Sequence, residues 1–142
     1  MESALKIITP FVTTHSFFIF PEDLNHTGSL FGGKILAEMD LVATRACRRI
    51  LYGTKCDGAV TACLERVDFK APAHLGDIIE LNATITDLGR TSIKIKVLVY
   101  KETPIGETSM ICEAYFTFVA IRKGKPKPHQ CILITPSTQH LN

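Results

Sequence analysis

The sequence predicts a single α+β domain in which a curved antiparallel β-sheet wraps around one long central helix. Residues 31–52 have helical periodicity with an unusually broad apolar surface, and several segments of alternating apolar and polar residues follow them. A chain of 142 residues is long enough to bury a substantial core. A helix this apolar needs cover on most sides, which long curved strands provide.

The first predicted elements are a strand, a loop and the helix. Residues 14–20 are rich in aromatic side chains and end at Pro21, as expected of a strand. Residues 21–30 are rich in turn-forming residues and predict a loop. The helix is expected from about Phe31 to Tyr52, with Gly53 as its stop. Most of its polar residues share one face of a helical wheel: Lys34, Glu38, Arg45, Arg48 and Arg49.

Alternating segments after Gly58 predict a meander of antiparallel strands. The segments are residues 59–71, 79–85, 93–99 and 110–118. In the first of them the alternation changes phase, which predicts a β-bulge near Glu65 and Arg66. The turns are expected at residues 72–77, 88–90 and 103–106. The domain is therefore expected at residues 1–121, followed by a basic, partly disordered C-terminal tail at 122–142.

Composition excludes several classes of protein. The formal net charge of +2 gives no reason to expect nucleic-acid binding. Five cysteines, an odd number without C-x-x-C spacing, predict neither a disulfide framework nor a zinc site. Reduced cysteines inside apolar runs favour a reducing, cytoplasmic location. No apolar run is long enough to span a membrane.

Asp40 is the sharpest anomaly in the predicted helix. It lies away from the polar face, among Leu36, Ala43, Thr44 and Cys47. An ionised carboxylate in such surroundings is costly unless it is paired, neutral or beside a cavity. The structural interpretation is a backbone hydrogen bond or an exposed helix end. The functional interpretation is a general base or nucleophile in a cleft.

The segment Asn25–Gly33 forms a second candidate site. Gly32 and Gly33 stand at the predicted helix start, where amides without side chains in the way can bind a developing oxyanion. The alternative is a glycine-rich turn that allows close packing. Asn25 is either an orienting group or a turn former. His26 is expected to be a surface histidine, and no cysteine has a companion pattern that predicts a thiol nucleophile.

The order and spacing of several motifs resemble the bacterial acyl-CoA thioesterases of the hotdog superfamily, the group related to brain-type acyl-CoA hydrolase. The motifs are Asn25-His-Thr-Gly-Ser-Leu-Phe-Gly-Gly33, Ile35-Leu-Ala-Glu-Met-Asp40, Phe69-Lys-Ala-Pro72, Gly76-Asp77, Gly89-Arg-Thr-Ser92 and Pro104-Ile-Gly106. They span roughly residues 15 to 121, and the match weakens after about Arg122.

The resemblance implies a hotdog fold and a homo-oligomer: a dimer with joined sheets, assembled further into a hexamer or tetramer. We expect a hexamer, as a trimer of dimers. The implied substrate is acyl-CoA, in a site split between protomers. Asn25 of one protomer would meet Asp40 of the other, and the Gly32 and Gly33 amides would polarise the thioester carbonyl.

We expect substrate and CoA contacts from five further positions: Phe31, Arg90, Thr91, Ser92 and Lys123. Asp40 would either activate a water molecule or attack directly to form an anhydride. Such a reaction requires no metal and no cofactor other than the CoA of the substrate.

Three other functions remain open at this point. A non-catalytic acyl-CoA-binding or sensing protein is the main alternative, because one fold serves several functions. A hotdog dehydratase with His26 as base is another, and it predicts activity that depends on His26 rather than Asp40. A nucleic-acid-binding module is the least supported, since the strands lack a basic face with interleaved aromatics.

Overall fold

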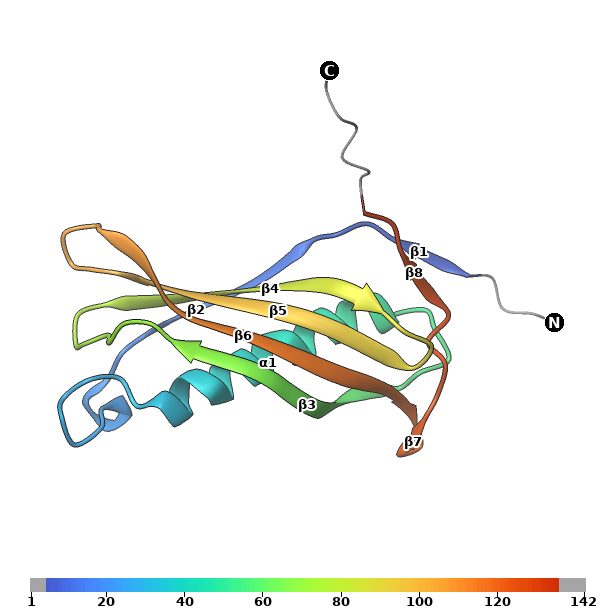
Figure 1. Cartoon of the computed structure of the whole chain (residues 1–142), viewed down its shortest axis with the longest axis horizontal. Helices are drawn as coiled ribbons and strands as arrows, with labels where there is room; N and C mark the ends of the chain where they lie inside the picture. The colour runs from blue at the N-terminus through green and yellow to red at the C-terminus, as the bar shows by residue number, and fades with distance from the viewer. Residues whose placement is uncertain (1–4, 136–142) are drawn as a thin grey trace, which may run out of the picture.

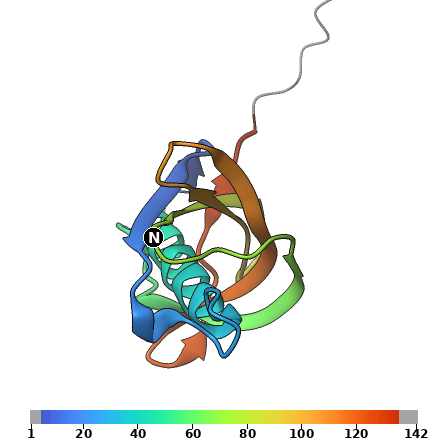
Figure 2. The ribbon, with the colours of Figure 1, turned by 90° about the vertical axis from the view of Figure 1, so that its left-hand side faces the viewer.

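The computed structural model describes residues 5–135, in which a six-stranded sheet curls around one α-helix (Figures 1 and 2). All neighbouring strands of this sheet are antiparallel. In spatial order the strands are β2 (Val12–Phe18), β4 (Ile78–Leu88), β5 (Ser92–Glu102), β6 (Thr108–Arg122) and β3 (Gly58–Phe69), with β7 (Lys125–Pro126) added on β6. The predicted α+β fold is confirmed.

Helix α1 (Gly32–Leu51) lies within the curve of the sheet, within one residue of its predicted bounds at each end. Gly53 follows it with a φ of 80°, a left-handed conformation that ends a helix at little cost in glycine. Met39 and Ile50 of α1 are fully buried against the inner face of the sheet, together with side chains such as Phe118. Burial of each such side chain contributes roughly 1.5–3 kcal/mol. Within residues 5–135, no helix combines the length and apolar character needed to cross a membrane.

The first long strand is shifted from its prediction. Strand β2 ends at Phe18, whereas the aromatic run predicted a strand over residues 14–20. Phe20 instead precedes the short 3-10 helix η1 (Pro21–Asp23), and its amide donates to the Asp23 carboxylate at 2.9 Å. At the end of the aromatic segment, the backbone therefore caps η1 instead of pairing with a neighbouring strand.

The edge of the sheet at β2 is covered by α1. Two arginines of the predicted polar helix face donate to carbonyl oxygens of the strand: Arg45 to Thr14 at 3.2 Å, and Arg49 to Val12 at 3.3 Å. Arg49 also donates to the Thr13 hydroxyl at 2.8 Å. These guanidinium groups occupy hydrogen-bonding positions that a strand edge otherwise offers to another chain.

The opposite edge, β3, is open. Its central residues are exposed, and nothing within residues 5–135 pairs with its outer side. The register against β6 shifts between Leu64 and Arg66, as the change of phase predicted, and a second shift lies between Thr61 and Cys63. Leu41 of α1, expected to be covered, is 58% exposed. The sequence pattern of α1 thus provides more apolar surface than one protomer covers.

Residues after 121 are more ordered, as far as 135, than the expected tail. Strand β7 pairs with the end of β6, and β8 (Cys131–Leu133) pairs in parallel with β1 (Lys6–Ile8). Between them His129 is buried; its ring accepts from the Cys131 amide at 3.0 Å and lies 3.1 Å from the Ser92 carbonyl. These long-range contacts have no local sequence signal. The remainder of the expected tail, 136–142, lies outside the described residues.

Candidate active site

The first turn of α1 presents two backbone amides that bind no other described group. Phe31 is the residue before the helix, and its carbonyl accepts from Lys34 and Ile35 at 3.0 and 3.3 Å. The amides of Gly32 and Gly33 have no acceptor within residues 5–135. At a helix N-terminus such amides carry partial positive charge and attract oxyanions.

Glycine is required at one of these positions for a steric reason. A Cβ atom on Gly33 would overlap the ring of Phe31, whereas one on Gly32 would lie at an ordinary 3.5 Å from the ring of Phe69. The two aromatic rings thus lie beside the free amides. The contact between helix and strand at Gly32 has ordinary spacing, and the close approach at Gly33 is to the exposed ring of Phe31, so close packing on a strand does not account for these glycines.

The Asn25 side chain organises the loop before the helix. Its Oδ1 accepts from the Thr27 amide at 2.9 Å, the Thr27 hydroxyl at 2.7 Å and the Ser29 amide at 3.1 Å. Its Nδ2 donates to the Ser29 hydroxyl at 3.0 Å. In the protomer Asn25 therefore acts as the turn former that the sequence allowed.

Asp40 lies half-buried on α1, where its Oδ1 accepts a hydrogen bond from the Thr61 hydroxyl of β3 at 2.5 Å. The carboxylate is therefore oriented toward the open strand. Thr44 donates to the backbone carbonyl of Asp40 at 2.8 Å, so it leaves both carboxylate oxygens to other partners. An oriented, half-exposed carboxylate suits a general base or a nucleophile.

Two buried cysteines near this region, Cys47 and Cys112, are poor nucleophiles. Burial raises the pKa of Cys47 well above its usual range, and the nearby charge of Asp40 raises it further. Burial also raises the pKa of Cys112 to about 11. Both thiols stay protonated at neutral pH, and a thiolate is the reactive form.

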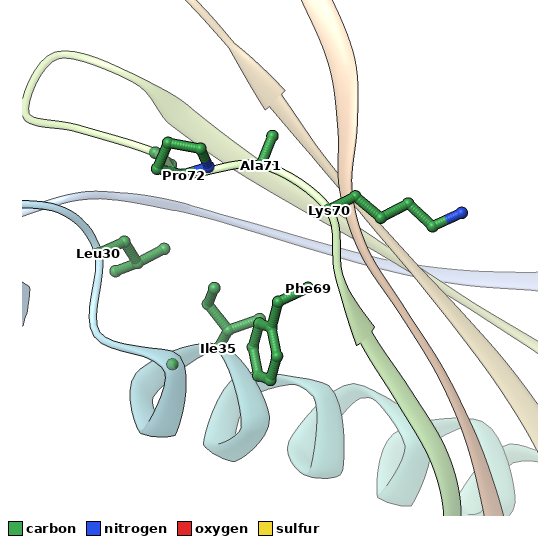
Figure 3. A pocket seen from close by; sticks show the side chains of 8 residues that line it. Leu30, Ile35, Phe69, Lys70, Ala71 and Pro72 are labelled. Atoms are coloured by element: carbon green, nitrogen blue, oxygen red, sulfur yellow. The ribbon is translucent and has the colours of Figure 1, made fainter.

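Two hollows flank the start of α1. One, of about 380 Å³, lies between the first helical turn and the end of β3 (Figure 3). The other, of about 640 Å³, lies toward the loop after β2, and Gly33 and Phe31 border it. Its remaining lining residues are mostly polar: Glu22, Asp23, Leu24, Asn25, His26 and Lys34. A ligand on the glycine amides can therefore extend in two directions.

The protomer does not bring all of the predicted site residues together. No contact within residues 5–135 joins Asn25 to Asp40, and eight residues of helix separate Asp40 from Gly32, about 12 Å along the axis. Arg90, Thr91 and Ser92, at the turn from β4 to β5, and Lys123, just after β6, belong to segments that lie near the other end of α1 (Figure 1). The helix of 20 residues is about 30 Å long.

The residues at that far end are held together by backbone contacts. The Thr91 carbonyl accepts from the Ala120 amide at 2.8 Å, and the Arg90 carbonyl accepts from the His129 amide at 3.3 Å. Lys123 begins the turn after β6, with its amide on the Asp57 carboxylate at 2.9 Å. The basic residues of this end are therefore remote from the Gly33 amide of the same protomer.

Comparison with known proteins identifies the family. Residues 27–107 match the thioesterase superfamily. An acyl-CoA thioester hydrolase of Haemophilus influenzae, described as uncharacterized, is 36% identical over 105 residues, 71% of this chain and 66% of that protein. YciA of Salmonella typhimurium, an acyl-CoA thioester hydrolase, is 33% identical over 113 residues, 76% of this chain and 82% of that protein.

The chain belongs to the thioesterase superfamily. This confirms the family predicted from its motifs. The match spans less than two thirds of some relatives, 66% of the Haemophilus protein and 63% of YkhA from Bacillus subtilis.

Solved structures of an acyl-CoA hydrolase and an acyl-CoA thioesterase share the fold of this chain. The acyl-CoA hydrolase of Bacillus cereus is 34% identical, with a TM-score of 0.80 over 89% of this chain and 76% of that one. HI0827, described as a hexameric broad-specificity acyl-coenzyme A thioesterase, is 29% identical in a variant with one aspartate changed to alanine. Its TM-score is 0.76 over 92% of this chain and 90% of that one.

Some site residues of this thioesterase-superfamily chain escaped the sequence analysis. Thr61 was not recognised as the partner of Asp40, because its strand and the helix meet only in the folded protein. Phe69 and Ala71 were noted only within a motif, although both line the hollow beside Gly32. The phase change in residues 59–71 was the available signal that β3 is irregular near the site.

Proposed function

We propose that this protein hydrolyses acyl-CoA thioesters to free CoA and a carboxylic acid, in a site formed between two copies of the chain. The observation that carries the proposal is the pair of unoccupied amides at Gly32 and Gly33. They provide a binding position for the oxygen of a thioester carbonyl. Family membership and the names of the relatives support the same reaction.

In the proposed reaction, the carbonyl oxygen binds the amides of Gly32 and Gly33, and Asp40 of the neighbouring copy faces the carbonyl carbon. Asp40 takes a proton from water while the water oxygen bonds to carbon; the carbon–sulfur bond then breaks, and the thiolate of CoA leaves and is protonated. Alternatively the Asp40 carboxylate bonds to the carbonyl carbon, the carbon–sulfur bond breaks and the CoA thiolate leaves, and water then hydrolyses the resulting anhydride to the acid and free Asp40. Removing an oxyanion donor typically costs about 100- to 1,000-fold in rate.

The open β3 edge supports a dimer as the unit. The β2 edge is covered by arginines, whereas exposed Val60, Leu64 and Leu41 surround β3 and the outer side of α1. A second copy that pairs along β3 would extend the sheet and cover this surface. It would also bring the far end of its helix near the first copy's Gly33, where Arg90 and Lys123 are proposed to contact the CoA phosphates. A hexamer is proposed from the hexameric relative HI0827.

The test is CoA release from a panel of acyl-CoAs, followed with a thiol-trapping dye. Asp40→Asn is expected to lower kcat by about 100-fold or more, a loss of at least roughly 2.7 kcal/mol in transition-state stabilisation. Asp87→Asn is the matched control, because Asp87 is an exposed carboxylate in β4. Equal activity of wild type and Asp40→Asn would remove Asp40 from the mechanism.

Two outcomes would redirect the proposal. Binding of acyl-CoA without turnover by the wild type would favour the acyl-CoA sensor instead. Loss of activity in His26→Ala but not in Asp40→Asn would favour the dehydratase alternative; His26 is exposed beside the polar hollow.

A further inference from the structure

The hollow between the first turn of α1 and the end of β3 is built almost entirely from apolar side chains. Figure 3 shows Leu30, Ile35, Phe69, Ala71 and Pro72 around it. Leu30 and Ile35 are almost completely buried and close its inner end, whereas Phe69 is 51% exposed at its mouth. The hollow is therefore open to solvent on the side of the glycine amides and closed inward.

Among the described residues that line the hollow, only Lys70 is charged, and its side chain points away from it. Figure 3 shows Lys70 extending to the other side of the strand, and its ammonium lies 3.2 Å from the Glu113 carboxylate. The amides of Lys70 and Ala71 also point away, since both donate to the Ile111 carbonyl, at 2.8 and 3.4 Å. This wall of the hollow thus offers no backbone donor to a ligand.

The neighbouring carbonyls are occupied in the same way. The Pro72 carbonyl accepts from Lys101 at 2.8 Å, and the Ala73 carbonyl accepts from the Leu30 amide at 2.8 Å. Pro72 has no amide hydrogen. Among the described residues that border the hollow, the amides of Gly32 and Ala73 have no acceptor, and Ala73 is buried.

We infer that this hollow binds the acyl chain of the substrate, that it selects uncharged chains, and that Phe69 and Ala71 set the accepted length. The inference rests on the proposed thioesterase function and specifies its substrate class. A carbonyl oxygen on the Gly32 and Gly33 amides places one substituent of the carbonyl carbon beside Phe69, at the mouth of the hollow. An apolar chain there buries its methylenes without leaving a polar group unpaired.

The pantetheine arm of CoA fits the other hollow better. It carries two amides, which would lose hydrogen bonds among apolar side chains, beside the Lys70 and Ala71 amides that already donate to Ile111. The hollow toward the loop after β2 has polar side chains at its border, such as Asp23, Asn25 and Lys34. The apolar hollow thus suits the acyl chain of a thioester, and the polar hollow suits its pantetheine arm.

Chain length and charge should both affect turnover. Each added methylene that enters the hollow is expected to raise kcat/KM about three- to fourfold, until the inner end at Leu30 and Ile35 is reached. Succinyl-CoA should be a poor substrate, because its carboxylate would enter a space without a cation.

The experiment compares kcat/KM for acetyl-, butyryl-, hexanoyl-, octanoyl-, decanoyl-, palmitoyl- and succinyl-CoA. Ala71→Leu fills the hollow and should lower kcat/KM at least about tenfold for chains of six carbons or more, with little effect on acetyl-CoA. Phe69→Ala opens the mouth and should move the optimum toward longer chains. Phe18→Ala, which removes another exposed ring from the other edge strand, is the matched control and should leave the profile unchanged.

Two results would overturn the inference. One is a chain-length profile that stays the same in both hollow variants. The other is an equal loss for all substrates together with weaker inhibition by free CoA, which would place the pantetheine arm in the hollow. If the wild type hydrolyses no acyl-CoA, the proposed function fails separately. The same series is then measured as Kd for acyl-CoA, with Phe69→Ala still readable if Ala71→Leu does not fold.

Discussion

At the scale of single residues, the hydrogen bond from Thr61 to Asp40 explains how a carboxylate is held on an otherwise apolar part of α1. The hydroxyl fixes one oxygen and leaves the other available to water or substrate. Because Thr61 is exposed on the open strand, the pair lies where a second copy would meet it. Its geometry is therefore set by β3 as well as by the helix.

Replacement of Thr61 by valine should disturb this orientation with little change in shape. We expect Thr61→Val to lower kcat about tenfold with KM nearly unchanged, since a hydrogen bond to a charged group contributes roughly 1.5 kcal/mol. The measurement is steady-state kinetics on one good acyl-CoA substrate, with circular dichroism to confirm folding. Thr86→Val, an exposed position on β4, is the control. An unchanged kcat would show that Asp40 needs no support from β3.

The sequence defined the role of Asp40 more closely than that of Asn25. Asp40 was identified because its position broke the helical pattern, which is a local property. Asn25 was left between two interpretations, and its bonds to Thr27 and Ser29 bear out the turn-forming one within a protomer. Its proposed contact with Asp40 requires a neighbouring chain. The position of that chain is not encoded in any local sequence pattern.

At the scale of elements, the outer face of strands β5 and β6 is linked by charges centred on Glu113. Its carboxylate accepts from the Tyr115 hydroxyl at 2.7 Å and pairs with Lys70 at 3.2 Å and Lys96 at 3.8 Å. The hydroxyl of Tyr115, and next the charge of Lys70, hold the pKa of Glu113 below its usual value. The network thus favours the ionised carboxylate in the folded state.

This shift has a defined effect on the free energy of unfolding. A carboxyl whose pKa is lowered by folding stabilises the protein above its unfolded pKa of about 4.3, and that contribution is lost as pH falls through the lower folded value. Glu113→Gln should therefore be less stable than wild type at neutral pH, and the difference should shrink as the pH falls through the lowered pKa of the folded state. Urea unfolding at several pH values measures it, with exposed Glu107→Gln as the control. A difference that is constant with pH would contradict the assignment.

Most of the helices and strands can be predicted from local sequence patterns. Which strands form the edges of the sheet cannot. The helix and the strands of the meander were predicted because periodicity reports which face is buried. That β3 forms one edge of the sheet depends on strand order, which periodicity does not contain. Strand β8 escaped prediction for the same reason, since it is short and pairs with β1 more than a hundred residues away.

At the scale of the whole molecule, one protomer leaves its proposed site incomplete. The amides of Gly32 and Gly33 lie at one end of α1, the candidate phosphate contacts Arg90 and Lys123 lie toward the other, and Asp40 lies between them. An antiparallel arrangement of two copies along β3 would bring complementary parts together. Assembly and activity should therefore be lost together.

A charge on the open strand tests this coupling. Leu64→Glu should weaken dimerisation at least about 100-fold in Kd, because pairing along β3 would bury an uncompensated carboxylate in each copy. Light scattering after size exclusion measures the assembly, and CoA release at the same protein concentration measures activity. Thr86→Glu, on the outer face of β4, should change neither. A fully active monomer of Leu64→Glu would contradict the shared site.

One edge of the sheet is covered and the other is open, which limits the number of chains that can join by strand pairing. A sheet open on both sides can add chains indefinitely, as in cross-β fibres. Here the guanidinium groups of Arg45 and Arg49 occupy the carbonyls of one edge, so each chain has a single side on which a neighbour can continue the sheet. The proposed pairing through that side would occupy the open edges of both chains and end growth by this route at two. The same arginines that join helix to strand thus act as a barrier to aggregation.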